Sequence, residues 1–215
     1  VRKIEGTPTG VAVIVIVDGD NRIILDAGAN GCVGEDDVRR LLENAEPGDI
    51  LLTQLENPTT TVGFALKLAK EKGLVTVLNP APIDRGILPY LPYADCVIPN
   101  ETEFAVLAGT EDLEAGAKRI LDMGVSDVIV TLGSRGYRYF GKEGTFGEPC
   151  IKVKVIDTTA AGDTFCGAFV TALSKEESVK DALRFANRAA ALTVTKAGAG
   201  QAIPTLAEYD AYYNH

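Results

Sequence analysis

The chain has 215 residues, of which 46% are hydrophobic, and its formal net charge is −9 at pH 7. This length and composition suit one domain, or one domain with a small extension, that buries a hydrophobic core. The acidic charge argues against nucleic acid and anionic membranes as partners, although backbone amides can still bind a phosphate group. The longest apolar run, VAVIVIV, is strand-sized and too short to span a bilayer.

Four cysteines are scattered along the chain without any Cys-x-x-Cys pair: Cys32, Cys96, Cys150 and Cys166. This spacing disfavours zinc and favours reduced, mostly buried thiols, which predicts a cytoplasmic protein. The single histidine, His215, is the last residue, and we expect no catalytic role for it.

The first half of the chain shows alternating strand and helix patterns. Two β-branched runs flank an Asp-Gly turn within Gly10–Gly28, which predicts a β-hairpin. The elements expected next are helix Glu35–Ala45, strand Asp49–Glu56, helix Thr59–Gly73, strand Leu74–Pro82, and a strand, turn and helix over Asp95–Gly109.

The second half continues the alternation. The expected elements are helix Thr110–Gly124, strand Asp127–Gly136, hairpin Tyr137–Phe146, alternating strand Cys150–Asp157, and helices Ala161–Leu173, Glu176–Lys196 and Thr205–Tyr213. Apolar strands that alternate with amphipathic helices predict an α/β fold with a mostly parallel sheet flanked by helices. Ligands bind such sheets beyond the carboxyl ends of the strands. The candidate loops therefore follow Leu52, Leu78, Ile98, Leu132 and Ile156.

The loop after Ile156 reads DTTAAGD and leads into a helix. Its small residues allow backbone N–H groups at the helix start to form an anion hole, which the helix dipole strengthens. Asp163 lies in the first turn, where a carboxylate can accept a proton from a hydroxyl that attacks phosphate. The alternative is that Asp163 only caps the helix.

The string DTTAAGDTF resembles the C-terminal signature of the ribokinase branch of the PfkB carbohydrate kinase family. Other strings resemble the family in the same order: a lid hairpin over Thr9–Asn30, QLENP at Gln54–Pro58, LNPAP at Leu78–Pro82, PNETE at Pro99–Glu103, TLGSRG at Thr131–Gly136 and VTKAGAGQAIP at Val194–Pro204. The resemblance implies a ribokinase-like, Rossmann-type fold with a small β lid hairpin.

The resemblance also implies an activity, ATP-dependent phosphorylation of D-ribose to ribose 5-phosphate, with Mg²⁺ and K⁺. Asp163 would be the general base, and the amides of Ala160, Ala161 and Gly162 would form the anion hole. Glu56 would contact the sugar together with Asp163. A solvated loop acid is the alternative for Glu56.

Further roles follow from the same resemblance. The nucleotide would be lined by Asn100, Thr131, Gly133, Ser134, Gly136, Asn187, Gly198 and Ala199. Glu103 would lie near the water shell of Mg²⁺, and K⁺ would be held, mostly through backbone carbonyls, by Asp157, Thr159, Val194 and Ala197. Asn100 could instead be a helix N-cap, and Asn187 an ordinary polar position on a long helix.

The family's N-terminal sugar-binding segment, with its Gly-Gly pair, finds no match, because the chain contains no Gly-Gly. We expect an N-terminally truncated member, with a partial β lid hairpin over residues 1–30 and an α/β nucleotide-binding and catalytic core over 31–215. It would be a natural short form, an experimental fragment or one piece of a cleaved enzyme.

An exposed sheet edge or lid would favour a homo-oligomer. The alternative function is a truncated protein that folds, self-associates and binds nucleotide with little or no sugar kinase activity. A third possibility is a kinase for another small alcohol.

Overall fold

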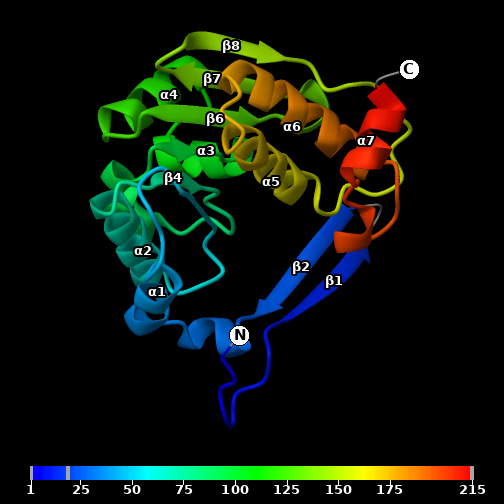
Figure 1. Cartoon of the computed structure of the whole chain (residues 1–215). Helices are drawn as coiled ribbons and strands as arrows, with labels where there is room; N and C mark the ends of the chain where they lie inside the picture. Colours follow the sequence, from blue (N-terminus) through cyan, green and yellow to red (C-terminus); the bar gives the residue numbers. More distant parts are fainter. Residues whose placement is uncertain (1, 18–19, 214–215) are drawn as a thin grey trace.

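A six-stranded sheet forms the centre of the computed structural model, which describes residues 2–17 and 20–213 (Figure 1). In spatial order the strands are β3 (Ile50–Thr53), β4 (Val75–Leu78), β5 (Cys96–Val97), β6 (Asp127–Thr131), β7 (Tyr137–Gly141) and β8 (Gly144–Glu148). Strands β3 to β6 pair in parallel, and β7 and β8 extend the sheet as an antiparallel hairpin. The predicted α/β fold with a mostly parallel sheet is confirmed.

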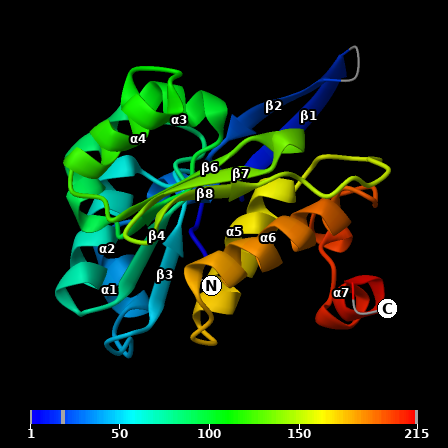
Figure 2. The same cartoon turned by 90° about the horizontal axis from the view of Figure 1, so that it is seen from above.

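Helices cover the sheet on both faces (Figure 2). Successive residues of β6 point to opposite faces of the sheet. Val128 and Val130 belong to the hydrophobic core under α2, α3 and α4, and Ile129 belongs to the core under α5 and α6. All three side chains are fully buried. The near-continuous apolar sequence of β6 therefore reflects burial on both faces, as expected for the inner strand of a parallel sheet.

The helices have ends that the sequence largely explains. Their bounds are α1 Glu35–Leu41, α2 Thr59–Glu71, α3 Glu101–Ala108, α4 Leu113–Asp122, α5 Ala161–Leu173, α6 Val179–Thr193 and α7 Leu206–Tyr213, with 3₁₀ helices at Gly28–Cys32, Arg85–Tyr93, Gly133–Arg135 and Gly200–Ala202. Helix α6 begins later than the predicted Glu176, because Glu176 has a left-handed backbone (φ 61°) and Ser178 caps the helix by accepting from the Asp181 amide.

The N-terminal hairpin forms a separate two-stranded antiparallel sheet of β1 (Val11–Val17) and β2 (Asp20–Asp26). Both views show it projecting from the body of the molecule (Figures 1 and 2). The predicted hairpin is confirmed, although residues 18 and 19 of its turn lie outside the described part. The division into a lid over 1–30 and a core over 31–215 stays a prediction.

The predicted strand Cys150–Asp157 is wrong. Its residues alternate as a strand would, but the segment leaves the sheet after β8 and pairs with none of the described strands. The amides of Ile156 and Asp157 donate instead to the Val194 carbonyl at the end of α6. Alternating apolar side chains predict one buried face but do not identify a backbone partner, and here Val155 and Ile156 are exposed.

The four thiols are free and differ in exposure: Cys96 and Cys166 are buried, Cys150 is half-buried and Cys32 is exposed. Burial raises the pKa of the Cys166 thiol to about 12, and the nearby charges of Asp163 and Glu103 contribute further. Within residues 2–17 and 20–213, no helix combines the length and apolar character needed to cross a membrane.

Two helical glycines provide a matched test of the packing. A Cβ on Gly116 of α4 would lie 2.5 Å from the buried Phe104 ring, whereas a Cβ on Gly167 of α5 would meet nothing within 4 Å. We expect Gly116→Ala to destabilise the protein by about 1–3 kcal/mol through overpacking. Gly167→Ala should stabilise it by about 0.5–1 kcal/mol, because alanine loses less backbone entropy in a helix. Urea unfolding measures both, and equal shifts would contradict this packing.

Candidate active site

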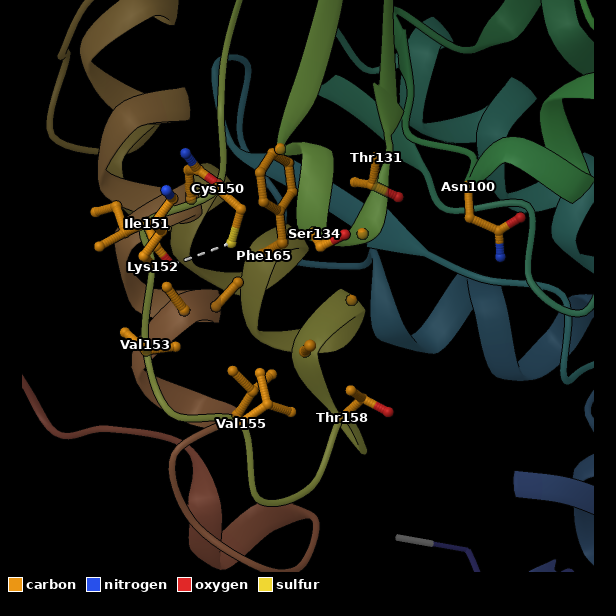
Figure 3. Close-up of a pocket in the computed structure, with 18 of the residues that line it drawn as sticks. Asn100, Thr131, Ser134, Cys150, Ile151, Lys152, Val153, Val155, Thr158 and Phe165 are labelled. Carbon is orange, nitrogen blue, oxygen red and sulfur yellow. Dashed lines mark hydrogen bonds between the residues drawn. The ribbon is translucent and has the colours of Figure 1, made fainter. Parts of the chain in front are cut away.

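A cavity of about 850 Å³ lies beyond the carboxyl ends of β5 and β6, beside the start of α5 (Figure 3). Nine of the residues proposed from the sequence line it: Asn100, Thr131, Gly133, Ser134, Gly136, Ala161, Gly162, Asn187 and Val194. Nine others are not in its lining: Glu56, Glu103, Asp157, Thr159, Ala160, Asp163, Ala197, Gly198 and Ala199. The parallel sheet thus brings together residues from loops that are far apart in the sequence.

Sequence reasoning missed one wall of this cavity. The wall consists of the unpaired segment after β8, with side chains from Cys150, Ile151, Lys152, Val153 and Val155 (Figure 3). Its alternating apolar residues predict a strand in a sheet, whereas in the structure Ile151 and Val153 are half-buried and Val155 is exposed. Phe165 of α5 and Ala190 and Ala191 of α6 also line the cavity, which makes this end of it apolar.

Two backbone contacts place that wall. Asn187 is 6% exposed, and its Nδ2 donates to the Pro149 carbonyl at 2.9 Å. Gly136 has φ 89°, and a Cβ there would lie 1.9 Å from the Glu148 carbonyl oxygen. The turn after β6 therefore needs glycine at this position, because the chain leaving β8 passes directly against it.

The start of α5 presents unbonded amides. Ala160 precedes the helix in the left-handed region (φ 62°, ψ 9°), which costs a residue other than glycine roughly 1–2 kcal/mol. The Ala161 amide donates to the Thr158 carbonyl at 3.3 Å. Among the described residues, no hydrogen bond occupies the Gly162 or Asp163 amides, which belong to the first turn. These two N–H groups and the helix dipole make this end of α5 attractive to an anion.

Asp163 lies in the same first turn and its side chain is exposed. Within the described part of the chain, no hydrogen bond or ion pair engages its carboxylate. Since a capping carboxylate would accept a backbone amide of its own helix, the helix-cap alternative for Asp163 lacks its defining bond. The carboxylate is free to accept a proton from a group bound beside the amides.

Asp157 connects two loops near the start of α5. Its carboxylate accepts from the Thr159 amide at 2.9 Å, the Thr159 hydroxyl at 2.7 Å and the Gly198 amide at 2.9 Å. The Gly198 amide, followed by the Thr159 amide and hydroxyl, lowers the pKa of Asp157. Two of the residues proposed for K⁺, Asp157 and Thr159, are therefore neighbours in space. The carbonyl of a third, Val194, already accepts hydrogen bonds from the amides of Ile156 and Asp157.

Asn100 and Glu103 form a reciprocal capping box at the start of α3. Asn100 Oδ1 accepts from the Glu103 amide, while the Asn100 amide and Nδ2 donate to the two Glu103 oxygens at 2.8 Å. Asn100 therefore is a helix N-cap and also lines the cavity. Burial raises the pKa of Glu103, which is 8% exposed. Searching residues 2–17 and 20–213 finds no group of three or more His, Cys, Asp or Glu side chains placed to hold a metal ion.

Glu56 is exposed in the loop after β3, and its amide donates to the Gln54 side chain at 2.8 Å. This bond shapes the loop but brings the Glu56 carboxylate to no described partner in the cavity. Its predicted role in sugar binding stays a prediction.

Residues 1–206 match the family model described as pfkB family carbohydrate kinase. The chain therefore belongs to the pfkB family of carbohydrate kinases. It is 40% identical over 228 residues to a ribokinase of Schizosaccharomyces pombe, an alignment that covers 100% of this chain and 70% of that protein. The resemblance inferred from the sequence strings is confirmed.

Solved structures agree with this assignment. The crystal structure of a ribokinase from Thermotoga maritima matches with a TM-score of 0.84 and 38% identity, covering 97% of this chain and 71% of that one. The structure of Arabidopsis thaliana ribokinase complexed with ribose and ATP matches with a TM-score of 0.81 and 34% identity, covering 95% and 69%. The chain thus spans about 70% of the length of these relatives.

The Asp157 contacts predict a pH dependence of stability. Because the folded pKa lies below the unfolded value of 3.8, the stabilisation is complete above that value and is lost as the pH falls below it. Asp157→Asn should be less stable than the wild type at neutral pH and should lose less stability on acidification. Urea unfolding between about pH 5 and pH 3 measures this window. Glu71→Gln, at an exposed carboxylate of α2, is the control and should keep the wild-type slope.

Proposed function

We propose that this chain binds ATP in the cavity and transfers the γ-phosphate to the primary hydroxyl of D-ribose, which yields ADP and ribose 5-phosphate. The observation that carries the proposal is the start of α5, where the amides of Gly162 and Asp163 and the adjoining Asp163 carboxylate have no hydrogen-bond partner among the described residues. The comparisons support a carbohydrate kinase of the ribokinase type. The relative crystallised with ribose and ATP supports these two ligands.

Asp163 would accept the proton of the sugar hydroxyl as that oxygen attacks phosphorus. The amides of Ala161, Gly162 and Asp163 would stabilise the negative charge that develops on the phosphoryl oxygens. The Ala161 amide would have to exchange its 3.3 Å bond to the Thr158 carbonyl for this purpose. The amide of Ala160, which the sequence also suggested, belongs to the N-cap residue, which precedes the turn that carries the amides of Gly162 and Asp163.

The two ends of the cavity suit the two ends of a nucleotide. The wall of Ile151, Val153 and Val155, together with the α6 alanines, offers an apolar surface for a purine base. Asn100, Thr131 and Ser134 supply polar groups at the other side. Gly198 and Ala199 would border the base from the loop after α6.

Mg²⁺ and K⁺ fit the oxygen-rich chemistry of the neighbouring loops. Mg²⁺ would neutralise phosphate charge, and Glu103 would hold it through water while its oxygens stay bonded to Asn100. K⁺ would be coordinated by the backbone carbonyl oxygens of Asp157, Thr159 and Ala197. The Val194 carbonyl already accepts hydrogen bonds from two backbone amides.

The decisive variant is Asp163→Asn, which keeps the size of the side chain and removes its capacity to accept the proton. We expect ribose-dependent ADP formation to fall by about 10²- to 10⁴-fold. ATP affinity measured by calorimetry should stay within about threefold, because little binding energy depends on this group in the ground state. Asp122→Asn, at an exposed ion pair of α4, is the matched control and should keep the wild-type rate.

Calorimetry with the wild type distinguishes the alternative. A chain that binds ATP but neither binds ribose nor releases ADP in its presence is a nucleotide-binding protein without sugar kinase activity. Binding of another small alcohol in place of ribose would identify a different substrate. The proposed roles of Asp163 and of the amides at the start of α5 would then stay the same.

We also propose that the chain self-associates through the hairpin. Val13 and Ile24 are paired across β1 and β2 and share one face with Val11, and these side chains are 51%, 64% and 55% exposed. Apolar side chains grouped on a projecting ribbon favour burial against a second surface. Leu52 is also 37% exposed on the edge strand β3.

Light scattering at micromolar concentration should therefore give at least twice the chain mass of 22.7 kDa. Ile24→Lys should shift the protein toward the monomer, because a charge on that face opposes its burial. Met123→Lys, at an exposed residue far from the hairpin in sequence, is the control. A wild-type mass of one chain would contradict self-association.

A further inference from the structure

A chain of buried hydroxyl groups connects α6 to the start of α5. Thr193, the last residue of α6, is fully buried, and its Oγ1 lies 3.0 Å from Thr164 Oγ1. Thr164 Oγ1 in turn donates to the Ala160 carbonyl at 2.8 Å. With one proton on each hydroxyl, the direction is Thr193 to Thr164 to the Ala160 carbonyl. The Ala189 carbonyl, 3.1 Å from Thr193 Oγ1, is the other acceptor for the Thr193 proton.

The end of this chain is the residue with the unfavourable backbone. Ala160 holds φ 62° without being glycine, and such a conformation persists only where the surroundings fix it. Its carbonyl accepts twice from Thr164, through the amide at 2.9 Å and through the hydroxyl at 2.8 Å. The orientation of this carbonyl sets the peptide plane that contains the Ala161 N–H, and with it the direction in which the first turn begins.

The same end of α6 holds the other side of the loop. The Val194 carbonyl, one residue after Thr193, accepts from the amides of Ile156 and Asp157 at 2.8 and 3.3 Å. The Asp157 carboxylate in turn accepts hydrogen bonds from the Thr159 amide and the Thr159 hydroxyl. The left-handed residue therefore lies between two attachments, which originate in Thr193, the last residue of α6, and in Val194, which follows it.

We infer that Thr164 and Thr193 are positioning residues for the proposed phosphoryl-transfer site. They hold Ala160 in the left-handed conformation and so fix the amides of Gly162 and Asp163 and the Asp163 carboxylate relative to the cavity. Neither hydroxyl lines the cavity, so they act through Ala160 and not on a ligand. The identity of the ligand rests on the proposed function, whereas the effect on the backbone does not.

The first test is independent of activity. Thr164→Val removes the hydroxyl at nearly constant shape, and we expect amide exchange at position 164, whose N–H donates to Ala160, to become about tenfold faster. Thr193→Val should give a smaller change of the same sign, since Thr164 keeps its bond to Ala160. Thr164→Ser keeps the hydroxyl and should restore slow exchange. Exchange is measured by NMR on the whole chain.

Thr171→Val is the matched control. The Thr171 hydroxyl makes the same bond to the carbonyl four residues earlier, to Gly167 at 2.7 Å, on the same helix α5 but at an exposed position. Exchange at position 164 should be unchanged in Thr171→Val. An equal acceleration in both variants would show a general loosening of α5 and overturn the inference.

The second test is kinetic and uses ribose-dependent ADP formation. Thr164→Val should lower kcat by about tenfold while KM for ribose stays within about twofold, because misplaced groups harm the transition state more than ground-state binding. Thr164→Ser should recover the rate and Thr171→Val should keep it. Unchanged kcat in Thr164→Val would overturn the inference.

The two tests separate the possible failures. A wild type without ribose-dependent ADP formation contradicts the proposed function, and the exchange comparison then decides the inference alone. Unchanged exchange in both Thr164→Val and Thr193→Val overturns the inference whatever the activity. If Thr164→Val fails to fold, Thr193→Val against Thr171→Val provides the same comparison.

Discussion

Both faces of the central sheet must be covered by helices, and this requirement determines where the helices and the candidate active site lie. Because β3 to β6 run in parallel, their carboxyl ends meet at one edge, and each connection back must cross a face of the sheet. The residues of β6 alternate between two hydrophobic cores, one under α2 to α4 and one under α5 and α6. Helix α5 is thereby packed with its first turn at the edge where the loops after β5 and β6 end.

The chemistry at that edge comes from backbone more than from side chains. The chain has a net charge of −9, yet the free amides at the start of α5 make a local site for an anion. The Asp163 carboxylate lies in the same helical turn as those amides, and within the described part of the chain no hydrogen bond or ion pair engages it. Contacts from the end of α6 reach the loop on both sides of Ala160, so the direction of the amides depends on the packing of the two helices.

Several residues combine roles that the sequence analysis had presented as alternatives. Asn100 caps α3 and lines the cavity, since its side-chain oxygen accepts the Glu103 amide while the residue borders the open space. Asn187 is a buried helix residue that lines the same cavity and holds the Pro149 carbonyl. Local spacing reveals one such role at a time, because the second depends on a partner distant in sequence.

The sequence alone predicted the order of the α-helices and of the strands that form the sheet, together with the loop that carries Asp163, because apolar periodicity, glycine turns and small residues are local properties. It also determined the family, through several strings in the same order. Only the tertiary structure decided that the segment from Cys150 to Asp157 forms a cavity wall and no strand, because pairing needs a neighbouring backbone that no local pattern specifies. The hydroxyl chain from Thr193 to Ala160 likewise needed the folded chain, since 29 residues separate its two threonines and only the packing of α5 on α6 brings them together.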